Sequence, residues 1–160
     1  MNYPVKKLYL DQTELKSCIG IFVKDAEVIN AGTTVNAMSA KHKNTEYDRY
    51  ATEYGIHFIF EDDVPVIDFY AVPQIDIFAT DGKGGIFGSV GEETNPRGDS
   101  AIIFISDKKE AHLVAVNFKE FVSSAADWKN HLQPYDAITL YESKADAEKE
   151  LEFIAPYELR

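Results

Sequence analysis

Residues 101–122 read AIIFISDKKEAHLVAVNFKEFV, and this stretch decides the fold. It contains two apolar runs rich in β-branched and aromatic residues, 101–105 and 112–116, on either side of a short polar link. That pattern is typical of a hairpin of two buried strands. Asn117 can then cap a helix, and Glu120 follows three positions later as in a variant of the capping box. The sequence therefore predicts a strand, a turn, a strand and a helix in direct succession.

The predicted helix after Asn117 carries an apolar stripe. Its members fall at i, i+3, i+4, i+7 and i+10, and they are Phe118, Phe121, Val122, Ala125 and Trp128. This spacing places them on one face of an amphipathic helix, which we expect to be part of the core. None of these side chains carries chemistry, so the stretch indicates a fold and not a function.

Further elements lie on both sides of this stretch. Strands are predicted over 56–60, 74–79 and 86–90, and helices over 45–54 and 144–155. Asn44 or Thr45 can cap the first of these helices and Gly55 can end it, while Ser143 can cap the second. Residues 74–79 alternate between polar and apolar, as in a half-buried strand, and a glycine in strand 86–90 indicates a bulge or a close backbone approach.

These elements predict an α+β protein. The first 43 residues give the weakest pattern, in which we expect a short helix near Asp11 and a turn or loop over residues 31–34. Strands in sequential hairpins, with helices before and after them, are typical of an α+β fold. We therefore expect residues 1–160 to form a single domain, with an antiparallel sheet of consecutive hairpins flanked by N- and C-terminal helices.

The composition predicts a soluble, cytoplasmic protein. A chain of 160 residues can hold a core without disulfides or metals, because a chain near this size buries roughly 68–70% of its unfolded surface. Cys18 is the only cysteine, so we expect neither an intramolecular disulfide nor a cysteine-based zinc site. We find no signal-peptide pattern at the N-terminus, and no stretch approaches the roughly 20 apolar residues of a membrane helix.

Negative charge is concentrated in the middle of the chain. The formal net charge is −11, and residues 53–93 hold nine acids against one base, Lys83. A negative surface repels nucleic acid and anionic membrane, so we expect neither as a partner, whereas a basic protein fits. The candidate partner-binding residues in this acidic belt are Glu61, Asp62, Asp63, Asp76, Asp81, Glu92 and Glu93. The alternative is that the belt only keeps the protein soluble.

No motif of a catalytic or metal site is present. The glycine-rich residues 81–85 lie between two predicted strands, whereas a phosphate loop joins a strand to a helix and ends in Gly-Lys-Ser/Thr. The four histidines lack zinc-binding spacing, and no serine lies in a Gly-x-Ser-x-Gly elbow. The acids at 61–63 lack the further ligands of a calcium loop. We therefore expect a non-enzymatic protein without catalytic residues, metal or cofactor.

A tyrosine stripe lies on the predicted helix over 45–54. Tyr47, Tyr50 and Tyr54 fall on one face, where they could stack on a small ligand. The interpretation that we favour is a half-buried helix face whose phenol groups reach water.

Three features between Ile75 and Phe121 occur together. They are a strand over 75–79 followed by the glycine-rich turn at 81–85, the strand over 101–105, and the helix start Asn117-Phe118-Lys119-Glu120-Phe121. In these features the chain resembles the SMI1/KNR4 superfamily, also called SUKH. The resemblance implies an α+β fold with an antiparallel sheet flanked by helices, and a role in protein binding without shared catalytic residues. Bacterial members are viewed as immunity proteins that neutralise toxins, many of them nucleases, and fungal members as regulatory interaction proteins.

The resemblance and the charge together predict a bacterial immunity protein. Its acidic belt would face the basic surface of a cognate toxin, such as the nucleic-acid face of a nuclease. One alternative is a regulatory or scaffolding interaction protein without a toxin partner. A second alternative is a small-ligand binder or enzyme that uses the tyrosine stripe and nearby carboxylates.

Overall fold

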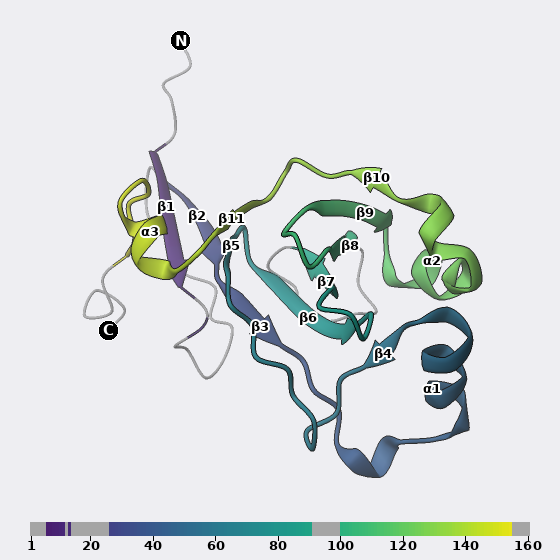
Figure 1. Ribbon diagram of the computed structural model, residues 1–160. Helices are drawn as coiled ribbons and strands as arrows, with labels where there is room; N and C mark the ends of the chain where they lie inside the picture. The colour runs from purple at the N-terminus through teal and green to yellow at the C-terminus, as the bar shows by residue number, and fades with distance from the viewer. Residues whose placement is uncertain (1–5, 12, 14–25, 91–99, 155–160) are drawn as a thin grey trace.

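The centre of the fold is a mixed, mostly antiparallel sheet. The structure, a computed structural model, describes residues 6–11, 13, 26–90 and 100–154 (Figure 1). Within these residues seven strands form the main sheet, in the order β10-β9-β8-β7-β6-β3, with β4 also paired to β6. Several short helices accompany the sheet, so the predicted α+β class is confirmed.

Four consecutive strands form the middle of the main sheet. They are β6 (Ile75–Thr80), β7 (Ile86–Val90), β8 (Ile102–Ile105) and β9 (Ala111–Ala115). Each strand pairs antiparallel with the next, as expected for apolar runs separated by turns. The hairpin predicted from residues 101–116 is therefore confirmed as β8 and β9.

Three shorter strands complete the main sheet in the described part of the chain. They are β3 (Thr33–Val35), β4 (His57–Phe58) and β10 (Gln133–Pro134). β3 runs parallel to β6, so the sheet is mixed and mostly antiparallel, where the sequence predicted an antiparallel one. The predicted turn or loop over 31–34 is confirmed only at Gly32, where φ is +116°. Thr33 and Thr34 belong to β3, because β-branched residues suit a strand.

Two small sheets lie beside the main one in the described residues. β1 (Lys6–Asp11) pairs in parallel with β2 (Ala26–Ala31), and β5 (Tyr70–Val72) pairs antiparallel with β11 (Thr139–Tyr141). In Figure 1, β1 lies on the same side of the molecule as the C-terminal helix α3 (Lys144–Glu148). Residues 6–11 form a strand and not a helix, and Asp11 ends that strand. Most of the helix predicted to begin near Asp11 lies outside the described residues.

Two helical segments begin at the caps that the sequence predicts. α1 (Thr45–Arg49) continues into the π-helix η2 (Tyr50–Tyr54), and Asn44 Oδ1 accepts hydrogen bonds from the first backbone amides of α1. Gly55 ends this helix with φ +71°, a left-handed conformation that glycine adopts without steric cost. α2 (Phe118–Ser123) begins after Asn117 and is followed by the 3₁₀-helix η3 (Ala125–His131). A further 3₁₀ turn, η1 (Ala40–His42), precedes α1.

The C-terminal helix is shorter than predicted. Ser143 Oγ accepts a hydrogen bond from the backbone N–H of Asp146 at 3.3 Å, which confirms the predicted cap. α3 ends at Glu148, however, and the predicted continuation to residue 155 is wrong for the described residues. The chain beyond α3 instead lies along β1, where Phe153 forms a bridge with Tyr9.

Side chains cover both faces of the main sheet. One face carries a mainly aromatic cluster with α2 and η3 packed on it, and this cluster includes Phe78, Phe87, Phe104, Phe121 and Trp128. The other face carries a mainly aliphatic cluster, which includes Ile59, Ile75, Ile77, Ile103 and Ile105. Strand β6 is therefore buried on both faces, and the prediction of a half-buried strand over 74–79 is wrong.

Gly88 allows β6 and β7 to approach each other closely. The register of this pair shifts between Ile77 and Ala79, next to the Ile77–Gly88 pair. A Cβ atom at Gly88 would lie 2.5 Å from Ile75 Cγ1, closer than real Cβ atoms come to other atoms. The glycine in this strand thus marks a bulge and a close approach, as predicted.

Candidate functional site

Three of the predicted acids lie in an exposed turn after β4. The backbone N–H of Glu61 donates to the carbonyl of Met38 at 2.8 Å, which ties the turn to the segment before α1. Lys43 Nζ lies 2.6 Å from Asp62 Oδ2, and this hydrogen bond lowers the pKa of Asp62. Glu61 and Asp63 are exposed and have no ion pair within the described chain. The turn at 61–63 is therefore accessible, as the partner-binding prediction requires.

The chain after this turn has no regular secondary structure, and its side chains alternate between half-buried and exposed. Those directed inward are half-buried: Pro65, Ile67 and Phe69. Those directed outward are Val64, Val66 and Asp68, and the two valines are 48% and 94% exposed. Lys109 Nζ lies 3.1 Å from Asp68 Oδ1 and holds the far end of the segment against the β8–β9 turn. We call residues 61–68 the acidic segment.

Asp81 does not join the acidic segment. Its Oδ1 accepts hydrogen bonds from the backbone N–H groups of Lys83 and Gly85, both at 2.8 Å, so the carboxylate shapes the β6–β7 turn. In the antiparallel pair of β4 and β6, His57 lies opposite Thr80, the neighbour of Asp81. Each residue after His57 therefore lies farther from Asp81 along the pair. Four residues of extended chain, about 13 Å, separate this position from Glu61.

Asp76 lies inside the main sheet, with only 6% of its surface exposed. The prediction that Asp76 binds a partner is therefore wrong, because β3 and β7 flank β6 and both faces of that strand are covered. Thr34 Oγ1 donates to Asp76 Oδ1 at 2.8 Å, and Gln74 Nε2 donates to Thr34 Oγ1 at 3.3 Å. Burial raises the pKa of Asp76 to about 6.

The last two predicted site residues, Glu92 and Glu93, lie outside the described residues, as does Cys18. The structure thus keeps Glu61, Asp62 and Asp63 together on the surface. It also adds Asp68, Val64 and Val66 to them, which the prediction did not include.

A groove of about 390 Å³ opens between the α1–η2 helix and α2. Its lining residues are Asn36, Met38, Asn44, Glu46, Tyr47, Tyr50, Phe58, Phe78, Phe118 and Val122. The Tyr47 ring lies 5.1 Å from the Phe58 ring and 5.6 Å from the Phe60 ring, which directly precedes the acidic segment. We call this hollow the aromatic groove, and it borders the acidic segment at its Met38 and Tyr47 end.

The tyrosine stripe divides between the groove and the core. Tyr47 and Tyr50 are half-buried and line the groove, in keeping with the predicted half-buried helix face. Tyr54 packs toward η3, where its carbonyl accepts a hydrogen bond from Trp128 Nε1 at 2.6 Å. The prediction located the stripe correctly but did not reveal the groove, because its opposite wall comes from α2, about 70 residues later in the chain.

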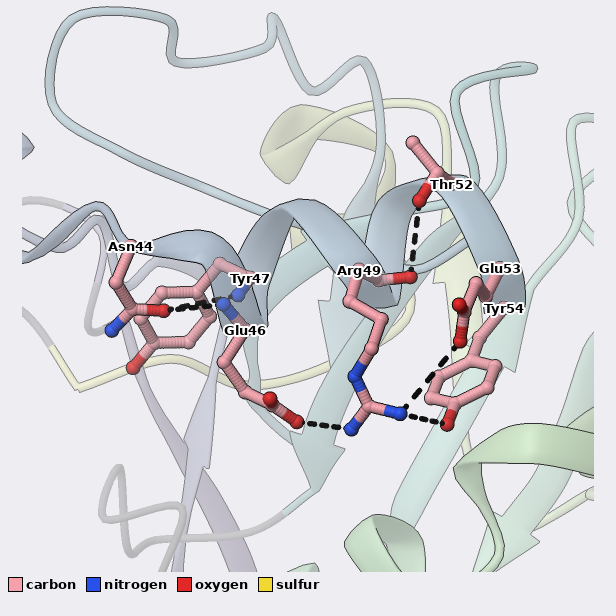
Figure 2. Close-up of polar contacts among 7 residues, drawn as sticks. All are labelled: Asn44, Glu46, Tyr47, Arg49, Thr52, Glu53 and Tyr54. Atoms are coloured by element: carbon pink, nitrogen blue, oxygen red, sulfur yellow. Dashed lines mark hydrogen bonds and ion pairs between the residues drawn. The ribbon is translucent and has the colours of Figure 1, made fainter.

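Charged side chains on α1 and η2 are paired with one another. Figure 2 shows Arg49 between Glu46 on one side and Glu53 and Tyr54 on the other. Arg49 Nη1 donates to the Tyr54 hydroxyl at 2.9 Å, and the guanidinium lies 5.5 Å from the centre of the Tyr54 ring. The helix therefore presents a cation held by both carboxylates and aromatic rings.

The described residues hold no cluster of three or more His, Cys, Asp or Glu side chains that could bind a metal ion. In this part of the chain, no helix is long and apolar enough to cross a membrane. Comparisons with protein-family models, curated proteins and solved structures found no match for the chain. The resemblance to the SMI1/KNR4 superfamily therefore stays a prediction.

The apolar part of the acidic segment could have been found in the sequence. Val64, Pro65 and Val66 lie between Asp63 and Asp68, in a short apolar run that contains a proline. Pro65 disfavours both helix and a central strand, which keeps such a segment at the surface. Which side chains face outward depends on the half-buried Ile67 and Phe69, and that choice requires the structure.

Proposed function

We propose that the chain is a non-enzymatic protein-binding domain that recognises a basic protein through its acidic segment. The resemblance to the SMI1/KNR4 superfamily makes a bacterial immunity protein the specific form of this proposal. Its partner would then be a cognate toxin, and a nuclease is the leading candidate because its nucleic-acid face is basic.

The observation that supports the proposal is the coincidence of exposed apolar and acidic side chains in one segment. Of the four large hydrophobic residues that are exposed in the described chain, Val64 and Val66 both lie here. Glu61 and Asp63 lie beside them without a cation to pair with in the described residues. Interfaces combine an apolar contact area with a polar rim, and this segment offers both parts.

The charge of the whole chain supports the same kind of partner. With a net charge of −11, the protein attracts basic proteins at long range. Complementary charge raises the association rate and rejects wrong partners more than it raises affinity. The exposed valines would then supply contacts that slow dissociation.

A regulatory or scaffolding protein without a toxin partner is the second candidate, and the same segment supports it. The two candidates differ in the consequence of binding. An immunity protein restores the growth of a cell that makes its toxin, whereas a scaffolding protein binds its partner without protecting the cell.

The experiment is growth rescue in a host that expresses the product of the reading frame directly upstream. The wild-type chain is expected to restore growth, and the variant Glu61→Lys/Asp63→Lys/Val66→Ser is expected to fail. The matched control is Glu142→Lys/Glu148→Lys/Val116→Ser, which makes the same changes at exposed positions elsewhere. Circular dichroism checks that both variants fold, since exposed substitutions change stability by only about 0.5 kcal/mol each.

Two results would contradict the proposal. If the binding-segment variant and the control protect equally well, the acidic segment is not the binding surface. If the upstream product is harmless and does not copurify with the wild-type chain, the immunity role is lost.

A further inference from the structure

We propose that the aromatic groove receives a lysine or arginine side chain of the partner. This inference rests on the proposed function, because it assigns a second contact to the same basic protein. It adds a site outside the acidic segment, and it names the chemical group that the site takes.

The walls of the groove suit the apolar part of a long side chain. Five aromatic rings and two aliphatic side chains line it, from Met38, Tyr47, Tyr50, Phe58, Phe78, Phe118 and Val122. The Phe78 and Phe118 rings are 5.6 Å apart, and the Phe58 and Phe78 rings are 6.1 Å apart, so the aromatic surface is continuous. Its volume of about 390 Å³ is within the roughly 300–1,000 Å³ typical of ligand pockets.

The rest of the lining favours a cationic head group. The remaining lining residues are polar or acidic, namely Asn36, Asn44 and Glu46, and none of the ten is basic. Aromatic faces attract ammonium and guanidinium groups through the ring quadrupole. Lysine and arginine combine an apolar stem with a cation, so they match both the aromatic walls and the net charge of −11.

The protein already binds its own cations in this way next to the groove. Lys43 Nζ lies 5.4 Å from the centre of the Phe60 ring while it pairs with Asp62. Arg49 lies over the Tyr54 ring while it pairs with Glu46 and Glu53 (Figure 2). Rings and carboxylates thus act together on both flanks of the groove, where Arg49 also lies 5.9 Å from the centre of the Tyr50 ring. The lining rings of Tyr47, Phe58 and Phe118 offer further aromatic faces to a cation of the partner.

The groove and the acidic segment can contact one partner at the same time. Glu61 is hydrogen-bonded through its backbone to Met38, which lines the groove. Phe60 packs edge-on against Tyr47, another lining residue. A basic surface that covers the segment therefore reaches the mouth of the groove.

The test is an NMR titration of the full chain with three blocked amino acids. The cationic probes are the N-acetyl, N-methylamide derivatives of lysine and arginine, and the same derivative of norleucine is the uncharged control of similar shape. We expect the cationic probes to shift resonances of Tyr47, Tyr50 and Val122 and to bind about fivefold or more tightly than norleucine, as a cation–π contact of about 1 kcal/mol requires.

Two matched variants locate the site. Val122→Arg places a guanidinium at the groove, where it repels a second cation and fills part of the space. Binding of the cationic probes should weaken at least tenfold. Val116→Arg makes the same change at a valine that is also exposed but does not line the groove, and it should leave binding unchanged.

Equal or tighter binding of norleucine would overturn the cation assignment, and so would equal effects of the two arginine variants. The absence of any shift would overturn the site itself. These outcomes are separate from the growth experiment. Probes that fail to bind while growth rescue succeeds contradict the groove alone, and probes that bind while rescue fails contradict the immunity role.

Discussion

Buried polar side chains gather at one place in the main sheet. Thr34, Gln74, Asp76 and Ser89 lie on the adjacent strands and strand ends of β3, β6 and β7, and the last three are almost wholly buried. Among the described residues Gln74 Oε1 and Ser89 Oγ have no hydrogen-bond partner, although Ser89 is the cross-strand neighbour of Asp76. Such a site favours a protonated Asp76, because the neutral acid avoids the cost of a buried charge.

The raised pKa of Asp76 predicts a pH-dependent gain in stability for Asp76→Asn. The folded protein keeps this proton up to about pH 6, while the unfolded chain releases it near pH 3.8. The folded state therefore binds more protons between these values, and the group's contribution to the free energy of unfolding falls as pH rises from about 4 to about 6. At pH 7.5 the variant should be more stable than wild type by about 1–3 kcal/mol.

Urea unfolding of both proteins at pH 4 and pH 7.5 measures this difference. Near pH 4 the two should be almost equally stable, because Asp76 is then protonated in the folded protein. A difference between variant and wild type that is the same at both pH values would contradict the buried-acid explanation.

Asn117 is predicted to stabilise α2 through its side chain. Asn117 Oδ1 accepts a hydrogen bond from the backbone N–H of Glu120 at 2.8 Å. Asn117→Ala should lower the free energy of unfolding by about 1 kcal/mol, and Asn117→Gly by only a few tenths, because glycine exposes the helix end to water. Chemical denaturation of the two variants makes the comparison, and equal losses would count against capping.

At the scale of elements, α2 and η3 hold the aromatic face of the sheet. Phe121 is wholly buried, and its ring lies 5.5 Å from Phe78 and 5.7 Å from Phe87. Phe121→Ala should lower the free energy of unfolding by about 3–5 kcal/mol, the range for truncation of a buried Phe. Val122→Ala, at the next position of the same helix but exposed, serves as the control. An unchanged melting temperature for Phe121→Ala would show that α2 is not packed as described.

The close approach of β6 and β7 predicts the cost of a side chain at Gly88. A Cβ atom there would meet Ile75 Cγ1 at 2.5 Å and Cδ1 at 2.6 Å, as well as the Asp76 carbonyl at 3.1 Å. Gly88→Ala should therefore destabilise the protein by about 1–3 kcal/mol, the usual cost of overpacking. Gly55→Ala is the comparison, because a Cβ atom at Gly55 has no atom of the described residues within 4 Å and its cost is that of the left-handed backbone alone. Equal melting temperatures for Gly88→Ala and wild type would rule out the overlap.

Elements defined by local signals could be predicted from the sequence. The β8–β9 hairpin, the Asn117 and Asn44 caps and the Gly55 helix end all depend on residues that are close to one another in the sequence. The parallel pairing of β3 with β6 joins residues about 40 positions apart, and no local pattern reports it. The same limit explains why α3 is shorter than its apolar stripe predicts, because Phe153 pairs with Tyr9 of β1 and does not continue the helix.

At the scale of the molecule, the acidic belt of the sequence divides into parts with different roles. Glu61 and Asp63 remain exposed, Asp81 shapes a turn and Asp76 is buried. The sequence located the acids that could form a binding surface, but burial and backbone hydrogen bonding decide which of these acids can contact a partner. The acidic segment is the part that can act at long range.

The central claim is that this segment attracts a basic protein, and the association rate constant against ionic strength tests it most directly. The proteins compared are wild type, Glu61→Lys/Asp63→Lys and the control Glu142→Lys/Glu148→Lys, with the upstream gene product or another captured protein as partner. Wild type and control should associate more slowly as salt rises from about 25 to about 300 mM, because screening shortens the range of the attraction. The binding-segment variant should associate about tenfold more slowly at low salt and respond weakly to added salt. Rates that are indifferent both to salt and to the reversal at Glu61 and Asp63 would contradict the claim and leave the acids with solubility as their role.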